Sequence, residues 1–231
     1  MNQRLTITLT ILVVLVNQHC LSKKLRDEKL KCGQIKGRLQ VASKDIQTPK
    51  AGQLPFAAVL WDEELKPICD AVIIDNRHVL TAAKCLRPKL KVSLGDYSLG
   101  GPDGEKFIEI VPNSNQTSQA DIMKLTTSQL IKFKLKYWGL GSVNAICTPK
   151  LGPKLGESVI AAGWGPIPGE LEAEKPHYKS TRMVKCPLQP GQNATANSLC
   201  LESTSASRLG SPIVRITREN RLELVSVQVS G

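Results

Sequence analysis

The stretch Val79-Leu80-Thr81-Ala82-Ala83-Lys84-Cys85 decides the fold of this chain. Most of its apolar part belongs to an expected strand, His78 to Ala82, which follows a turn at Asp75-Asn76. A lysine and a cysteine follow the strand directly, and a second cysteine, Cys69, precedes it. The stretch therefore predicts a strand that ends in a loop containing a lysine and a cysteine.

Short apolar runs separated by turn residues continue on both sides of this stretch. Glycine, proline and asparagine mark the turns, and no segment shows strong helical periodicity or an internal repeat. Such spacing favours an all-β barrel or sandwich. The segment 218–221 is expected to turn between the last two strands. The other expected strands are Ala57–Trp61, Ala71–Ile74, Lys91–Leu94, Phe107–Val111, Ser158–Ala162, Met183–Cys186, Pro212–Thr217 and Leu222–Val229.

The first 22 residues are expected to be a signal peptide. Arg4 precedes an apolar run of twelve residues, Leu5 to Val16, and polar residues follow it. Such a run is too short to span a bilayer but suits the core of a signal peptide. A short buried helix is the alternative. Residues 23–31 are charged, lack apolar periodicity and are expected to form a linker.

The chain has seven cysteines, and Cys20 lies at the edge of the expected signal peptide. An even number in a secreted chain indicates disulfides, here three, although spacing alone allows 15 pairings. A zinc site is not expected, because the chain has no CxxC pair and only three histidines. The six remaining cysteines are Cys32, Cys69, Cys85, Cys147, Cys186 and Cys200.

Two sequons, at Asn115 and Asn193, are expected glycosylation sites and agree with secretion. The net charge is +11 among 231 residues. A solvated basic surface is the preferred interpretation, and binding of a polyanion is the alternative. No nucleic-acid motif is present, and no other apolar run is long enough to span a membrane. We expect no cofactor and no metal.

The central stretch resembles the VLTAAHC signature of the trypsin-like serine proteases, in which a cysteine likewise precedes it. Other segments match that family in the right order. They are Leu54-Pro55-Phe56 (FPW), Ser93-Leu94-Gly95-Asp96-Tyr97 (RLGEH), Ala120-Asp121-Ile122-Met123-Lys124-Leu125 (NDIALL), Ala145-Ile146-Cys147-Thr148-Pro149 (PICLP), Ala162-Gly163-Trp164-Gly165 (TGWG) and Gly210-Ser211-Pro212-Ile213-Val214 (the end of GDSGGPLV).

The resemblance implies two antiparallel six-stranded β-barrels. It places a propeptide-like linker at residues 23–44, the first barrel at 45–140 and the second at 141–231. The family continues through a last strand and a terminal helix, so the second barrel is expected to be truncated. The implied disulfides are Cys32–Cys147, Cys69–Cys85 and Cys186–Cys200.

The resemblance also implies that catalysis is lost. Peptide hydrolysis by this family needs a serine, a histidine base and an aspartate. Asp121 matches the aspartate, but Lys84 stands at the base position and Leu209 at that of the nucleophile. A lysine beside a carboxylate stays cationic, and leucine has no nucleophilic atom. Lys84 is expected to be a surface charge or to pair with Asp121. Leu209 is expected to fill space, with contact to an apolar ligand as the alternative.

Neighbouring positions depart from the family in the same direction. Arg208 stands where an aspartate pairs with the amino terminus created by activation, and a guanidinium would repel that terminus. Ser207 replaces a glycine of the oxyanion hole. Ser203, near the base of the specificity pocket, provides no acid there. The sequence after Arg38 departs from the family's IVGG, so activation by cleavage is not expected.

We therefore expect a secreted, non-catalytic homologue that acts by binding extracellular proteins. Inactive family members commonly serve as cofactors, decoys or scaffolds for active proteases, so proteases or their inhibitors are the expected partners. Residual serine-type endopeptidase activity is one alternative, and a polyanion-binding secreted protein is a second. A gene product in decay that folds poorly is a third.

Overall fold

The computed structural model describes residues 31–41, 45–101, 105–111, 121–134, 140–149, 151–167, 173–186, 199–203 and 208–229. All the strands that the structure describes belong to one compact unit, Cys32–Gly231. The cleavage region of the expected signal peptide, Ser207, Asn115 and Asn193 lie outside the described residues.

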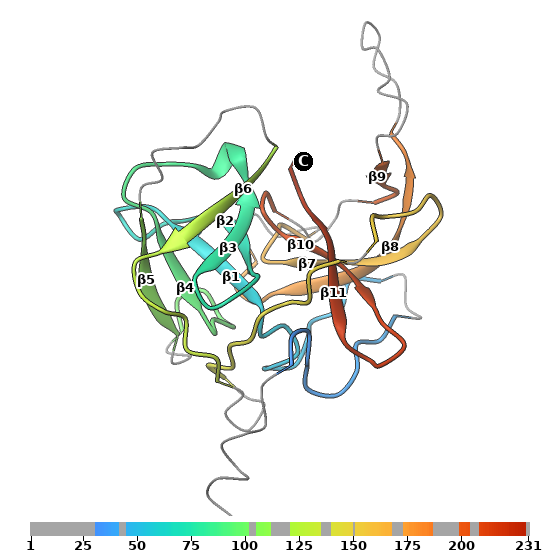
Figure 1. Cartoon of the computed structure of the whole chain (residues 1–231), viewed down its shortest axis with the longest axis horizontal. Coiled ribbons are helices and arrows are strands. Elements are labelled where there is room, and N and C mark those ends of the chain that lie inside the picture. The colour runs from blue at the N-terminus through green and yellow to red at the C-terminus, as the bar shows by residue number, and fades with distance from the viewer. Residues whose placement is uncertain are drawn as a thin grey trace, which may run out of the picture. The chain divides into compact units, whose positions relative to one another are not determined.

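The first half of the unit is a closed antiparallel barrel of six strands in the order β1-β2-β3-β6-β5-β4 (Figure 1). Its strands contain alternating or continuous apolar residues, and their Val, Ile, Leu and Ala side chains fill the interior of the barrel. A short 3-10 helix, η1 (Ala83–Cys85), follows β3. The strands are β1 (Ala57–Trp61), β2 (Pro67–Ile73), β3 (His78–Ala82), β4 (Lys91–Leu94), β5 (Lys106–Val111) and β6 (Ile122–Thr127).

The second half is an open sheet of five strands in the order β11-β10-β7-β8-β9. Its strands are β7 (Ser158–Gly163), β8 (His177–Lys185), β9 (Leu199–Leu201), β10 (Pro212–Ile216) and β11 (Leu222–Val227). The prediction of an all-β fold with one complete and one incomplete barrel is confirmed. The expected turn at 218–221 joins β10 to β11, where the Thr217 N–H donates to the Arg221 carbonyl at 2.8 Å.

Four elements differ from the sequence prediction. β2 begins at Pro67 rather than Ala71, so Asp70 lies inside a strand. β8 covers nine residues, of which only the carboxyl-terminal end was expected as a strand. β6 and β9 were not expected as strands. β6 contains Lys124, Thr126 and Thr127 among its six residues, which weakens the apolar signal of the strand.

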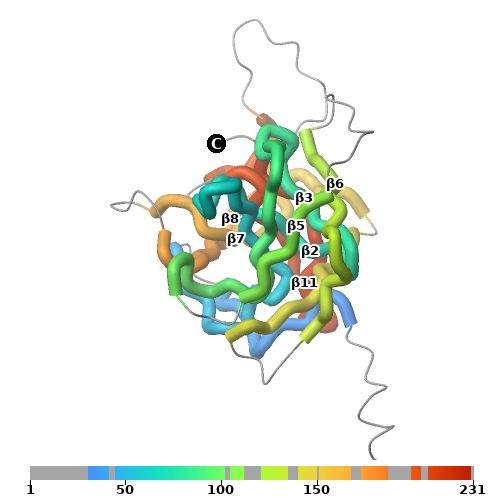
Figure 2. The backbone as a smooth tube through the Cα atoms, turned by 90° about the vertical axis from the view of Figure 1, so that its left-hand side faces the viewer, coloured from blue at the N-terminus to red at the C-terminus, as the bar shows by residue number. Residues whose placement is uncertain are grey.

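The segment 32–41 packs against the second sheet. Gly33 donates to the Ala145 carbonyl at 2.8 Å and accepts from the Leu222 N–H at 2.9 Å. Ile35 and Leu39 are buried in a cluster that includes Phe56 of the first half. In Figure 2 this blue segment lies close to β11, as it does in Figure 1. Within the region expected to be a linker, these residues are therefore part of the core.

Candidate functional site

The structure gathers the three positions that the sequence aligns with a catalytic triad around one disulfide, Cys69–Cys85. Lys84 lies on η1 beside that bridge, and the Ala83 N–H donates to the Asp121 carbonyl at 2.9 Å. The residue after Cys69 donates its N–H to the Leu209 carbonyl, also at 2.9 Å. The fold therefore brings Lys84, Asp121 and Leu209 to one region of the first barrel.

Lys84 and Asp121 make no ion pair with each other among the described residues, and both side chains are exposed. The carbonyl of Lys84 accepts a hydrogen bond from the Arg87 guanidinium at 2.9 Å. Of the two expected roles for Lys84, the structure thus favours a surface charge over an ion pair. Solvent-exposed charges of this kind contribute little to stability.

Leu209 is half-buried, and its side chain packs against the hydrophobic core of the first barrel. Ala83, next to Lys84, contacts the same core. An apolar side chain in this place gains free energy by leaving water. The geometry therefore gives Leu209 a packing role and provides no oxygen or sulfur atom at this position.

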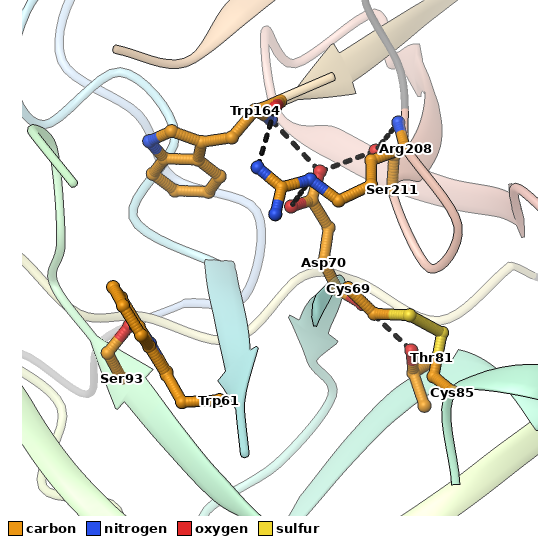
Figure 3. Close-up of polar contacts among 9 residues, drawn as sticks. All are labelled: Trp61, Cys69, Asp70, Thr81, Cys85, Ser93, Trp164, Arg208 and Ser211. Carbon is orange, nitrogen blue, oxygen red and sulfur yellow. Dashed lines mark hydrogen bonds and ion pairs between the residues drawn. A yellow bond between two sulfur atoms is a disulfide. The ribbon is translucent and has the colours of Figure 1, made fainter. Parts of the chain in front are cut away.

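Arg208 turns inward and pairs with Asp70, a fully buried residue of β2 (Figure 3). Its Nε lies 3.6 Å from Asp70 Oδ1, and its Nη2 donates to the Trp164 carbonyl at 2.7 Å. The Arg208 side chain is only 15% exposed. The charge that was expected to repel an amino terminus instead has a carboxylate partner within the chain.

Two further donors bind Oδ2 of the Asp70 carboxylate, whereas Oδ1 is buried without a hydrogen-bond partner among the described residues and has only the Arg208 charge nearby. The Ser211 hydroxyl donates to Oδ2 at 2.5 Å, and the Trp164 N–H donates to the same oxygen at 2.9 Å. The Arg208 N–H in turn donates to Ser211 Oγ at 2.8 Å. We call these four residues, Asp70, Trp164, Arg208 and Ser211, the clasp.

Burial raises the pKa of Asp70 above the usual carboxyl range. The Arg208 charge opposes this effect, as do the hydrogen bonds from Ser211 and Trp164. Desolvation is the larger influence because the carboxylate is completely shielded from water. In the folded state, burial therefore makes the charged form of the Asp70 carboxyl group energetically less favourable than it is in water.

Two glycines allow the backbone to approach the clasp closely. A Cβ on Gly210 would overlap the Asp70 carbonyl, and Gly210 also has a positive φ of 84°. A Cβ on Gly163 would overlap the Asp70 carboxylate and the Ser211 hydroxyl. Only glycine fits both places without displacing the clasp.

The sequence prediction missed Asp70 as a site residue. The available signal was a lone acid between Cys69 and the apolar run that follows it, because a charge in a buried strand requires a partner. That partner, Arg208, lies far along the chain and was not identifiable from local pattern. The Thr81 hydroxyl donates to the Asp70 carbonyl at 2.8 Å and fixes the backbone there.

Other positions that the sequence singled out are not members of the clasp. Ser203 Oγ accepts a hydrogen bond from Lys179 Nζ at 3.1 Å, so a cation adjoins it. Arg38 is exposed, while Leu39 after it is buried.

The structure contains the disulfides Cys32–Cys147, Cys69–Cys85 and Cys186–Cys200. His78 lies in β3, paired with Asp75, and His177 lies in β8.

The described residues contain no group of three or more His, Cys, Asp or Glu side chains able to hold a metal ion. Among the same residues, no helix has both the length and the apolar character needed to cross a membrane.

The closed barrel, the open second sheet and the disulfide beside η1 define a trypsin-type domain. A family model described as Trypsin matches residues 43–218, and the chain belongs to that family.

Mouse kallikrein-8 is 34% identical over 130 residues, which cover 51% of this chain and 46% of kallikrein-8. Rat vitamin K-dependent protein C is 32% identical over 130 residues, covering 50% of this chain and 27% of that protein. The chain thus spans less than half the length of these two relatives.

Among solved structures, neuropsin, a serine protease expressed in the limbic system of mouse brain, superposes with a TM-score of 0.59 at 26% identity. The match covers 73% of this chain and 81% of neuropsin.

Proposed function

We propose that this chain is a secreted, non-catalytic member of the trypsin family that acts by binding extracellular proteins. The observation that carries the proposal is the side chain of Leu209, which packs against the first-barrel core at the position aligned with the nucleophile. Acyl transfer requires an attacking atom there, and a hydrocarbon side chain has none.

The surroundings of Leu209 support the same conclusion. A general base must accept a proton and lie within hydrogen-bond reach of the nucleophile. Lys84 has only ammonium donors when charged, and its side chain is exposed to solvent. Asp121 is exposed as well, and the residue at the aligned base position is Lys84 rather than a histidine. Arg208 is committed to Asp70 and the Trp164 carbonyl.

Secretion is part of the proposal and rests on chemistry rather than on a matched relative. Three disulfides form within the described residues, and disulfides persist in oxidising compartments. The amino-terminal apolar run is of signal-peptide length. Proteases or their inhibitors are the proposed partners, by analogy with other inactive members of the family.

A peptidase assay tests the loss of catalysis. Purified secreted protein is incubated with a panel of fluorogenic peptides and, separately, with a serine-directed covalent probe. Active trypsin at equal concentration is the positive control. We expect no turnover and no labelling. Labelling of a residue near Leu209, or turnover that persists after contaminant removal, would overturn the proposal and favour residual hydrolase activity.

A binding assay tests the proposed binding of extracellular proteins. The purified chain is immobilised and exposed to extracellular fluid, and bound proteins are identified by mass spectrometry against a bead-only control. Recovery of a protease, an inhibitor or a protease substrate, followed by reconstitution of the pair from purified components, supports the binding role. Failure to recover any such protein contradicts it without bearing on catalysis.

A further inference from the structure

The clasp joins the two halves of the fold. Asp70 belongs to β2 of the closed barrel. Trp164 directly follows β7, and Ser211 directly precedes β10, both in the open sheet. A single buried carboxylate of the first barrel therefore receives hydrogen bonds from the end of β7 and the start of β10, which are adjacent because the two strands pair in antiparallel orientation (Figure 3). Hydrogen bonds between buried polar groups of two sheets favour one relative placement of those sheets.

The backbone of residues 208–211 is fixed by bonds that surround the clasp. The Asp70 N–H donates to the Leu209 carbonyl, and the Gly210 N–H donates to the Gln228 carbonyl at 2.8 Å. The Ser211 N–H donates to the Arg208 carbonyl at 3.0 Å. These residues are thus held by β2 on one side and by the end of β11 on the other.

The charges of the clasp are matched within the uncut chain. Arg208 already has an anionic partner in Asp70 and a neutral acceptor in Trp164. Leu39, which a cut after Arg38 would make the new amino-terminal residue, is buried in a different cluster with Phe56 and Leu222. An ammonium group near the guanidinium of Arg208 would be repelled.

We infer that the Asp70–Arg208 pair is a built-in conformational clasp that gives residues 208–211 their final structure without cleavage at Arg38. The guanidinium of Arg208 has its anionic partner in the intact chain, so pairing at this place needs no amino group released by cleavage. We expect cleavage at Arg38 to leave the surface around Leu209 unchanged. This inference goes beyond the proposed function and holds whether or not a partner binds.

Amide hydrogen exchange on an uncleavable chain tests the first part. Arg38→Gln removes the basic residue, and exchange is followed at the amides of Asp70, Gly210 and Ser211. We expect these amides to exchange at least about a hundredfold more slowly than in an unstructured peptide. Exchange at unprotected rates in the uncut chain would overturn the inference.

A matched pair of arginine variants tests the role of the ion pair. Arg208 and Arg215 lie in or beside the same sheet, each with an acidic partner and with side chains 15% and 16% exposed. We expect Arg208→Met to speed exchange at Gly210, Ser211 and Trp164 by about tenfold or more. Arg215→Met should leave those amides unchanged. Equal exchange in the two variants would contradict the inference.

The double variant Asp70→Asn with Arg208→Met keeps the test decisive if the single variant does not fold. Removing both charges avoids an unpaired buried carboxylate. We expect this chain to fold, with β1 amides protected as in the wild type and the 208–211 amides exchanging faster. Wild-type protection at those amides would show that the pair does not hold them. Because exchange reports neither turnover nor binding, this result is separate from the tests of the proposed function.

Discussion

Arg208 Nε lies 3.6 Å from Asp70 Oδ1, so a strand of the first barrel and the residue before Leu209 share a buried ion pair. The carboxylate is fully buried and the guanidinium nearly so. A pair in this environment loses much of its Coulomb attraction to desolvation, and the hydrogen bonds from Ser211 and Trp164 offset part of that loss.

Removing one partner of this pair is expected to destabilise the fold strongly. Arg208→Met should lower the free energy of unfolding by about 3–5 kcal/mol, because it leaves the Asp70 carboxylate buried and unpaired. Adding Asp70→Asn should recover most of the loss. Urea unfolding of the two single variants and the double variant measures the coupling. Strict additivity of the single effects would exclude a direct interaction between the two side chains.

The stability of the chain should depend on pH through Asp70. Burial raises its pKa in the folded state, so the native protein holds this proton more tightly than the unfolded chain does. The sign follows from linkage: stability contributed by this group falls as pH rises from the usual carboxyl range through the raised pKa.

Asp70→Asn should remove that dependence. Unfolding midpoints of the wild type and the variant, measured from about pH 4 to pH 8, should therefore diverge as the pH rises, with the wild type losing more. A wild-type curve parallel to that of the variant across this range would show that Asp70 does not titrate as the structure indicates.

Gly210→Ala is expected to be severely destabilising. The new methyl group would overlap the Asp70 carbonyl, and the backbone φ of 84° disfavours a side chain. Gly156 is the matched control, since its φ is 76° and a Cβ there meets nothing within 4 Å. We expect Gly156→Ala to cost about 1 kcal/mol and Gly210→Ala at least about twice that. Equal decreases in the thermal unfolding midpoint of the two variants would show that the Asp70 carbonyl does not exclude a side chain at position 210.

Leu209→Ser should reduce stability and create no peptidase. The leucine packs against the first-barrel core, so losing that contact should cost about 1–2 kcal/mol. Leu155, which is 58% exposed, provides the control, and Leu155→Ser should change stability by less than about 0.5 kcal/mol. Denaturant curves give the stabilities, and a fluorogenic substrate tests activity. Turnover by Leu209→Ser would mean that the remaining groups still form a working site.

The strands that the sequence predicted well are those with uninterrupted or alternating apolar residues, such as Ala57–Trp61 and Lys91–Leu94. The sequence predicts too short a strand for β8, because Lys179, Ser180 and Thr181 give its first part no apolar pattern. Pairing with β7 stabilises the extended backbone of these residues. β9 has only three residues, too few for an alternating pattern.

The site was predictable only where a residue matched a motif. Leu209 and Lys84 stand in recognisable segments, so their chemistry could be assessed from the sequence. The inward orientation of the Arg208 side chain could not be predicted, because it depends on Asp70. Only the tertiary structure brings these two residues, from the two halves of the fold, into contact. A repulsive position was expected, whereas the structure provides a counter-charge.

The Cys32–Cys147 disulfide joins sequence on both sides of Arg38. A protease that cuts after Arg38 would produce two polypeptides that migrate together on a gel run without thiols. Cut and intact material would therefore be counted as a single species until the sample is reduced, and a tissue survey by apparent size alone would overlook processing of this protein altogether.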